Sequence, residues 1–196
     1  SPITIHQSLI HQCTIPMPLV EILSIGTELI LGRIADTNAQ WLAQQIEQVG
    51  SCVRQVTTMR DDPDEITAVI HEAIERGATH IITTGGLGPT PDDRTVDTVA
   101  AMAGCGTVTD EGLIAHFLQR LRRSGQNKIS NHMRKVAIIP EVATAGPNAN
   151  GWGHCIIMTH RGVELFILPG PPREVRALYP VYIEPALREA DRRSNL

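Results

Sequence analysis

The stretch that decides the fold is residues 80–95, which read HIITTGGLGPTPDDRT. The apolar start of this stretch, residues 80–83, predicts a buried strand. Gly85, Gly86 and Gly88 follow, and they allow a loop whose backbone N–H groups approach a ligand closely. We expect a helix from about residue 91, whose N-terminus would add partial positive charge behind the loop. A strand, a glycine-rich loop and a helix in this order are typical of phosphate binding. The Gly-Lys-Ser/Thr ending of a Walker A loop is absent.

The same order of strand, loop and helix occurs twice before this stretch. Residues 20–25 and 53–57 predict strands, and helices are expected from Thr37, with Gln40 completing a capping box, and from Pro63 behind Asp62. The helix from about residue 91 is expected to end at Gly104, and a further helix is expected to carry Leu113 to Leu121 and to end near Gly125. Alternating strands and helices predict right-handed crossovers and a parallel sheet that is covered on both faces.

The C-terminal part predicts that the sheet is mixed. Residues 136–139 are expected to form a strand and residues 140–153 a loop. Residues 155–158 and 163–168, with a short turn at Gly162, predict an antiparallel hairpin. A last helix is expected to start near Pro172 and to kink at Pro180 and Pro185. The predicted fold class is therefore α/β with a mixed, mostly parallel sheet.

The composition indicates one globular domain and argues against several classes of protein. The chain has 196 residues, of which 42% are hydrophobic and 3% aromatic, and 17 Lys and Arg stand against 21 Asp and Glu. This balance argues against a nucleic-acid binder and against a basic membrane-surface protein. Four cysteines without CxxC spacing, and no apolar run of about 18 residues, favour a cytoplasmic location and no membrane span. We expect a tail or an added edge segment over residues 1–16 and a single domain over residues 17–196.

Two carboxylates at the end of the glycine loop predict a divalent metal ion. Asp92 and Asp93 would repel a phosphate bound by the loop unless a cation such as Mg²⁺, Mn²⁺ or Co²⁺ lies between them. The alternative is that both side chains only stabilise the helix N-terminus, with Thr90 as its cap. The same choice between ligand binding and local capping applies to Glu28, Asp36 and Asn38, which lie after the first strand.

Two further groups of residues are candidates for the same site. Pro169, Gly170 and Glu174 lie after the last strand, where a rigid turn is the alternative interpretation. Arg134 and Lys135 could neutralise a polyphosphate or could be ordinary solvated surface residues. Because ligands bind where the carboxyl ends of parallel strands meet, we expect residues 26–38, 84–95 and 168–174 to lie together. His154 and His160 have no acidic or cysteine partner at metal-ligand spacing and are expected to be structural.

Four motifs in order carry a family resemblance. They are Gly26-Thr27-Glu28-Leu29, Asp36-Thr37-Asn38-Ala39, the glycine loop that ends in Asp92-Asp93-Arg94-Thr95, and Leu168-Pro169-Gly170 with Pro172-Arg173-Glu174. Together they resemble the amino-terminal domain of the competence/damage-inducible protein CinA. More broadly, residues 18–185 resemble the molybdopterin-binding domains of molybdenum cofactor biosynthesis proteins of the MoaB/Mog type.

The resemblance implies a three-layer α/β/α domain that forms a dimer or trimer and binds a nucleotide or pterin. The cofactor-biosynthesis branch adenylylates molybdopterin with ATP and magnesium, whereas the CinA-like branch is associated with metal-dependent hydrolysis of ADP-ribose. The adenylylating enzymes typically carry Arg-Asp where this chain has Asp92-Asp93, which favours hydrolysis of a nucleotide pyrophosphate to AMP and ribose 5-phosphate. Pterin adenylylation and a non-catalytic binding module are the alternatives.

The expected site residues follow from the motifs and from the resemblance together. The catalytic residues are Asp92 and Asp93, and the metal ligands are these two with Glu28. The ligand-binding residues are Thr84, Gly85, Gly86, Leu87, Gly88, Thr90, Thr95, Asp36, Asn38, Arg134, Lys135, Pro169, Gly170 and Glu174.

The chain also departs from the family pattern. The carboxyl-terminal amidohydrolase domain that CinA-like proteins usually carry is expected to be absent. Residues 148–154 read NANGWGH, where the family usually has Asn-Pro-Val-Gly-Thr-Ala-Pro-Gly. We therefore expect this wall of the pocket to differ in shape.

Overall fold

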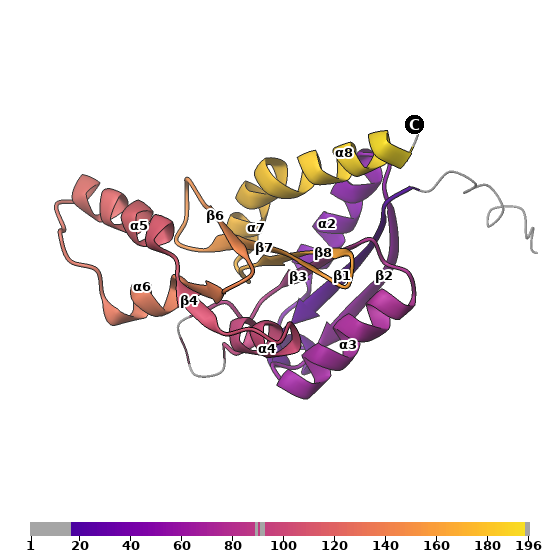
Figure 1. The fold of residues 1–196 in the computed structure, drawn as a ribbon, viewed down its shortest axis with the longest axis horizontal. Coiled ribbons are helices and arrows are strands. Elements are labelled where there is room, and N and C mark those ends of the chain that lie inside the picture. The colour runs from indigo at the N-terminus through magenta and orange to yellow at the C-terminus, as the bar shows by residue number, and fades with distance from the viewer. Residues whose placement is uncertain (1–16, 89, 91–92, 195–196) are drawn as a thin grey trace, which may run out of the picture.

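The computed structural model describes residues 17–88, 90 and 93–194, so the predicted tail over residues 1–16 lies outside the described residues. A six-stranded sheet has the order β2-β1-β3-β8-β7-β6. Strands β2, β1, β3 and β8 are parallel neighbours, and β7 and β6 are added antiparallel (Figure 1). The prediction of a mixed, mostly parallel sheet is therefore confirmed. The strands are β1 (Leu19–Ile25), β2 (Cys52–Met59), β3 (His80–Thr84), β6 (Thr144–Pro147), β7 (His154–His160) and β8 (Val163–Leu168).

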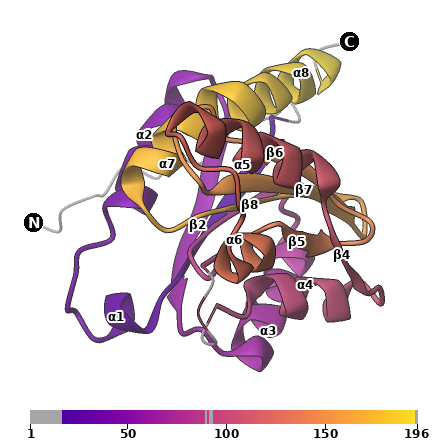
Figure 2. The same cartoon turned by 90° about the vertical axis from the view of Figure 1, so that its left-hand side faces the viewer.

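Helices cover both faces of this sheet. The helices are α1 (Thr27–Ile30), α2 (Thr37–Gln48), α3 (Pro63–Glu75), α4 (Thr95–Met102), α5 (Glu111–Arg123), α6 (Asn131–Val136), α7 (Pro172–Leu178) and α8 (Glu184–Ser194). Side chains of β8 alternate between two cores: Leu165 and Ile167 pack with α3, α4 and α5, and Phe166 and Leu168 pack with α2, α7 and α8. Figures 1 and 2 show the sheet between these helices. The three-layer arrangement is confirmed.

The beginnings of two helices differ from the prediction. Asp36, not Thr37, is the N-cap of α2, and its side chain accepts the Ala39 N–H at 2.9 Å. Thr37 is already helical, so the capping box with Gln40 does not form. Helix α4 begins at Thr95, later than the expected residue 91. The segment between the glycine loop and α4 is therefore longer than the sequence pattern indicated.

The last helical region is interrupted where Pro180 predicts a kink. A π-helical turn, η2 (Tyr179–Ile183), joins α7 to α8. Pro180 has no N–H to donate to an earlier turn, so the ladder of hydrogen bonds changes register there. The expected kink at Pro185 is wrong, because Pro185 lies in the first turn of α8, where a missing N–H is tolerated.

Several short elements between residues 107 and 147 were not predicted, whereas a strand near residues 136–139 was. Strands β4 (Thr107–Thr109) and β5 (Ile138–Pro140) form a separate antiparallel pair, and β6 lies within the stretch expected to be a loop. Helix α6 runs to Val136, so the strand expected over residues 136–139 is shorter and begins later. Within the described residues, no helix has the length and apolar character needed to cross a membrane.

Candidate functional site

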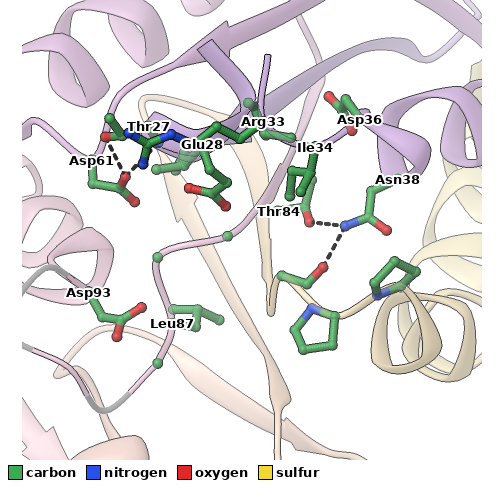
Figure 3. Close-up of a pocket in the computed structure, with 18 of the residues that line it drawn as sticks. Thr27, Glu28, Arg33, Ile34, Asp36, Asn38, Asp61, Thr84, Leu87 and Asp93 are labelled. Carbon is green, nitrogen blue, oxygen red and sulfur yellow. Dashed lines mark hydrogen bonds between the residues drawn. The ribbon is translucent and has the colours of Figure 1, made fainter. Parts of the chain in front are cut away.

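A cavity of about 700 Å³ lies at the carboxyl ends of the parallel strands (Figure 3). Its lining comes from residues 25–38 after β1, residue 61 after β2, residues 84–94 after β3 and residues 170–172 after β8. The three segments predicted to gather here, 26–38, 84–95 and 168–174, all contribute to it. The expectation from the topology of the sheet is confirmed.

The glycine loop passes too close to its neighbours for other residues. A Cβ atom on Gly85 would lie 2.0 Å from the backbone oxygen of Ile25, and Gly85 has a φ of 108°. A Cβ atom on Gly86 would lie 2.0 Å from the hydroxyl oxygen of Thr95. The loop therefore runs between the end of β1 and the start of α4, where only glycine fits.

The loop also leaves its backbone donors available. The Gly85 N–H donates to the Leu168 oxygen at 3.1 Å. The next three N–H groups, on Gly86, Leu87 and Gly88, donate to no acceptor among the residues that the structure describes. Successive unpaired N–H groups in a loop of this kind form a concave binding site for anions. The arrangement fits a phosphate group at the loop.

Asn38 joins the three segments of the site. Its side-chain Nδ2 donates to the Thr84 hydroxyl oxygen and to the Gly170 backbone oxygen, both at 2.8 Å (Figure 3). The Thr84 hydroxyl in turn donates to the Pro169 oxygen at 3.2 Å. Asn38 and Thr84 therefore hold α2, the end of β3 and the turn after β8 together. Pro169 itself is buried and is not part of the cavity lining.

Among the described residues, four carboxylates and two guanidinium groups line the cavity. The carboxylates are Glu28, Asp36, Asp61 and Asp93, and the cations are Arg33 and Arg94. Glu28 points into the cavity towards the glycine loop (Figure 3), and its carboxylate has no hydrogen-bond partner among the described residues. The excess of negative charge means that a phosphate ligand would bind here more favourably together with a cation.

Two of these carboxylates hold loops. Asp93 Oδ2 accepts a hydrogen bond from the Thr90 backbone N–H at 2.7 Å and a second one from the Thr90 hydroxyl. Asp61 Oδ2 accepts the backbone N–H and the hydroxyl of Thr27 at 2.8 and 2.9 Å. Asp93 therefore closes the end of the glycine loop, and Asp61 fixes the start of α1. The Oδ1 atoms of both carboxylates accept no hydrogen bond from the described residues.

The donor set fits a divalent cation only if a ligand completes it. No group of three or more His, Cys, Asp or Glu side chains in the described parts of the chain could hold a metal ion. Asp92, expected to be a metal ligand, lies outside the described residues. Mg²⁺, however, is commonly held by one or two carboxylates together with phosphate oxygens and water. Glu28 and Asp93, which line the same cavity, fit that pattern.

The other predicted residues lie around the cavity or away from it. Thr95 Oγ1 donates to the Gly85 oxygen at 3.5 Å, and Lys135 Nζ donates to the Thr90 oxygen at 2.6 Å. These two side chains support the loop from outside the cavity. Arg134 is exposed on α6 and does not line the cavity. Glu174 does not line it either, because its Oε1 accepts the N–H groups of residues 152 and 153 at 3.0 and 3.1 Å.

Sequence reasoning missed three charged residues of the lining. Asp61, Arg33 and Arg94 all face the cavity. Asp61 lies two residues after the end of β2, so its position relative to a parallel strand is similar to that of Glu28. Arg33 and Arg94 lie in stretches that carry no periodic pattern.

The two histidines of β7 differ in their surroundings. His154 is buried, and burial lowers its pKa to about 4, although the charge of Asp110 opposes this. His160 lies at the other end of the strand, where its ring stacks on His71 with 5.8 Å between ring centroids. Its pKa is also lowered, first by burial and then by the charge of Arg161.

Comparison with known proteins defines the class. The model of the family described as "Probable molybdopterin binding domain" matches residues 21–189, so the chain belongs to this family. A Bacillus cereus relative with the name "Putative competence-damage inducible protein" is 36% identical over 176 residues, which are 90% of this chain. The chain spans 42% of the length of that relative.

Solved structures agree with this assignment. The CinA protein of Thermoplasma acidophilum, described as of unknown function, is 30% identical with a TM-score of 0.77. The alignment covers 87% of this chain and 98% of that one. The molybdopterin biosynthesis enzyme MoaB of Thermus thermophilus has a TM-score of 0.57 at 23% identity, over 89% of this chain and 97% of that one, and supports the fold alone.

Proposed function

We propose that this chain is a metal-dependent hydrolase of a nucleotide pyrophosphate such as ADP-ribose. One observation carries the proposal: the loop Gly86–Gly88, whose N–H groups have no acceptor among the described residues, lines a cavity of about 700 Å³ that Glu28 and Asp93 also line. Anion donors and carboxylates in one cavity are compatible when the ligand binds as a complex with a cation. The volume is within the range of about 300–1,000 Å³ that small-molecule sites have.

The binding mode follows from the charges around the loop. The N–H groups of Gly86, Leu87 and Gly88 would bind one phosphate of the pyrophosphate. Arg33 and Arg94 line the same cavity and can pair with the oxygens of the second phosphate. Asn38 and Thr84, which join three segments of the site, would keep the walls of the cavity in place during binding.

The reaction needs water at the phosphorus atom. A new bond forms between the water oxygen and one phosphorus, the bridging P–O bond breaks, and the bridging oxygen leaves with the electron pair on the second phosphate. The protons of the attacking water pass to solvent or to the phosphate oxygens of the products. ADP-ribose and water would give AMP and ribose 5-phosphate. Glu28 and Asp93 would hold the divalent cation, which when bound neutralises phosphate charge and lowers the pKa of coordinated water.

The test is release of AMP from ADP-ribose with Mg²⁺, Mn²⁺ or Co²⁺ by the native protein and by Asp93→Asn. Asparagine keeps an oxygen that can accept the Thr90 N–H, so this variant removes mainly the charge. Asp64→Asn, on the exposed first turn of α3, is the matched control and should keep the native rate. We expect metal-dependent release of AMP that falls at least about 100-fold in Asp93→Asn, as the loss of a transition-state charge contact would give. Absence of turnover by the native protein with each metal would contradict the proposal.

Adenylylation of a pterin is the second candidate, and the molybdopterin-binding family model favours it. Transfer of AMP from ATP to molybdopterin, without hydrolysis of ADP-ribose, would support this candidate over the first. Thermal stabilisation by ADP-ribose or by a pterin without any product would instead indicate a module that only binds its ligand.

A further inference from the structure

A second and smaller cavity, of about 60 Å³, lies against the glycine loop. Gly86, Leu87, Gly88 and Asp93 line both cavities, so the loop forms a shared wall. The remaining lining of the small cavity comes from other elements, namely α4, α6, β5 and the first residue of β7, His154. We call this space the rear chamber, because the large cavity lies on the other side of the loop.

The imidazole of His154 faces the rear chamber without a partner. The residue is 2% exposed, and neither ring nitrogen has a hydrogen-bond partner among the described residues. Leaving a buried polar group unpaired costs about 1–3 kcal/mol, and nearly all such groups bond to protein or to ordered water. A neutral imidazole offers one donor and one acceptor, so His154 can bind two partners at once.

The size of the chamber indicates what those partners are. An internal water needs about 10–15 Å³ of accessible volume, so the 60 Å³ chamber has room for more than one water. It is far smaller than the roughly 300 Å³ at which small-molecule sites begin. Asp93 and Asp97 line the chamber against a single described cation, Lys135, and this negative balance disfavours an anion. No metal-ligating group of three side chains includes them within the described chain.

Backbone oxygens of the glycine loop can accept hydrogen bonds from water in the rear chamber. The backbone oxygens of Gly86, Leu87 and Gly88 accept no hydrogen bond from the described residues. In a trans peptide the N–H and C=O bonds point in opposite directions. The Leu87 and Gly88 N–H groups share their peptides with the Gly86 and Leu87 oxygens. When these N–H groups face a phosphate in the large cavity, these two oxygens therefore face away from it. Water in the rear chamber can donate to them and also bond to His154.

We propose that His154 is a positioning residue that holds the glycine loop through water in the rear chamber. It fixes the peptide planes so that the N–H groups face the ligand phosphates. This inference rests on the phosphate site of the proposed function. The glycine loop then has supports on both sides: Asp93 and Thr95 from the protein, and His154 through water.

The binding test uses inorganic pyrophosphate with Mg²⁺, because this ligand reports the loop without requiring turnover of a nucleotide. His154→Leu removes both nitrogens, and His154→Gln restores a donor and an acceptor. His160→Leu is the matched control, since its Nε2 is also unpartnered but it lies at the far end of β7. We expect His154→Leu to weaken binding on the order of tenfold, the effect of about one hydrogen bond, and His154→Gln to recover most of it. His160→Leu should bind as the native protein does.

Two further measurements keep the inference open to refutation. Thermal unfolding of each variant shows whether it is folded, and unchanged binding by a folded His154→Leu would overturn the proposal. A high-resolution crystal structure of the native chain should show water bonded to His154 and to a loop carbonyl. A direct bond from His154 to a protein group, or a dry chamber, would also overturn it. If native protein fails to bind pyrophosphate, the phosphate site is wrong, while the crystal structure still decides whether His154 holds the loop through water.

Discussion

Replacing Gly85 by alanine tests the close passage of the glycine loop. The added Cβ would lie 2.0 Å from the Ile25 backbone oxygen, well below any normal contact, and the φ of 108° is one that alanine rarely adopts. The overlap is between the new Cβ and a backbone oxygen at the end of β1, and neither atom belongs to a rotatable part of a side chain. Neither can move by a change of rotamer, so the loop itself must shift.

A control variant separates the two contributions to the loss of stability, backbone strain and steric overlap. Gly77 also has a positive φ, of 86°, but a Cβ there would meet nothing within 4 Å. Gly77→Ala should therefore lose only the backbone term, about 1–2 kcal/mol of the free energy of unfolding. Gly85→Ala should lose that term and about 1–3 kcal/mol of overpacking as well, or about 2–5 kcal/mol in total.

The assay is chemical unfolding of both variants and of the native protein, followed by titration with ADP-ribose. We expect Gly85→Ala to be the less stable of the two and to bind ADP-ribose more weakly, because the shifted loop no longer aligns its N–H groups. Gly77→Ala should bind normally. Equal stability of the two variants, or normal binding by Gly85→Ala, would refute the reasoning.

Three other predictions follow from single contacts. Burial lowers the pKa of His154 from 6.5 to about 4, so on acidification the unfolded chain binds the proton before the folded chain does. The free energy of unfolding should therefore be fully retained above about pH 6.5 and fall by about 3 kcal/mol by about pH 4. In guanidinium unfolding, His154→Gln should show a shallower dependence of this free energy on pH. Asn38→Ala removes two hydrogen bonds of 2.8 Å and should lose about 2 kcal/mol of stability by the same assay, whereas no loss would mean that the three segments do not depend on it. Glu174→Ala should lose about 1.5–3 kcal/mol because its carboxylate accepts two N–H groups, while Glu174→Gln keeps an acceptor oxygen and should lose clearly less; equal losses would contradict this role.

The repeated pattern of strands and helices made most of the fold predictable. Apolar runs such as residues 20–25 and 163–168 are long enough to show their burial, and Asp62 with Pro63 marks a helix start without ambiguity. The elements that were missed are short. Three residues, as in β4, show no period of two, and four residues, as in α1, form a single helical turn. Their positions depend on tertiary pairing that no local pattern reveals.

The site was predictable to the extent that topology alone determines it. Parallel strands bring their carboxyl ends together, which places Glu28, Asn38 and Gly170 at one cavity. Which side of a turn a side chain faces is a different matter. Glu174 follows the same strand as Gly170, yet its carboxylate holds the backbone at residues 152 and 153. Hydrogen bonds between segments far apart in the chain decide such orientations, and a single sequence does not contain them.

The central claim is that the backbone N–H groups of Gly86, Leu87 and Gly88 bind the phosphates of the ligand. The most direct test is a titration of the isotope-labelled chain with ADP-ribose and Mg²⁺, followed through the backbone amide resonances. We predict saturable shifts of these three amides, with little change at Gly77, which lies at the opposite end of β3. Saturable shifts elsewhere, with the three loop amides unmoved, would contradict the account.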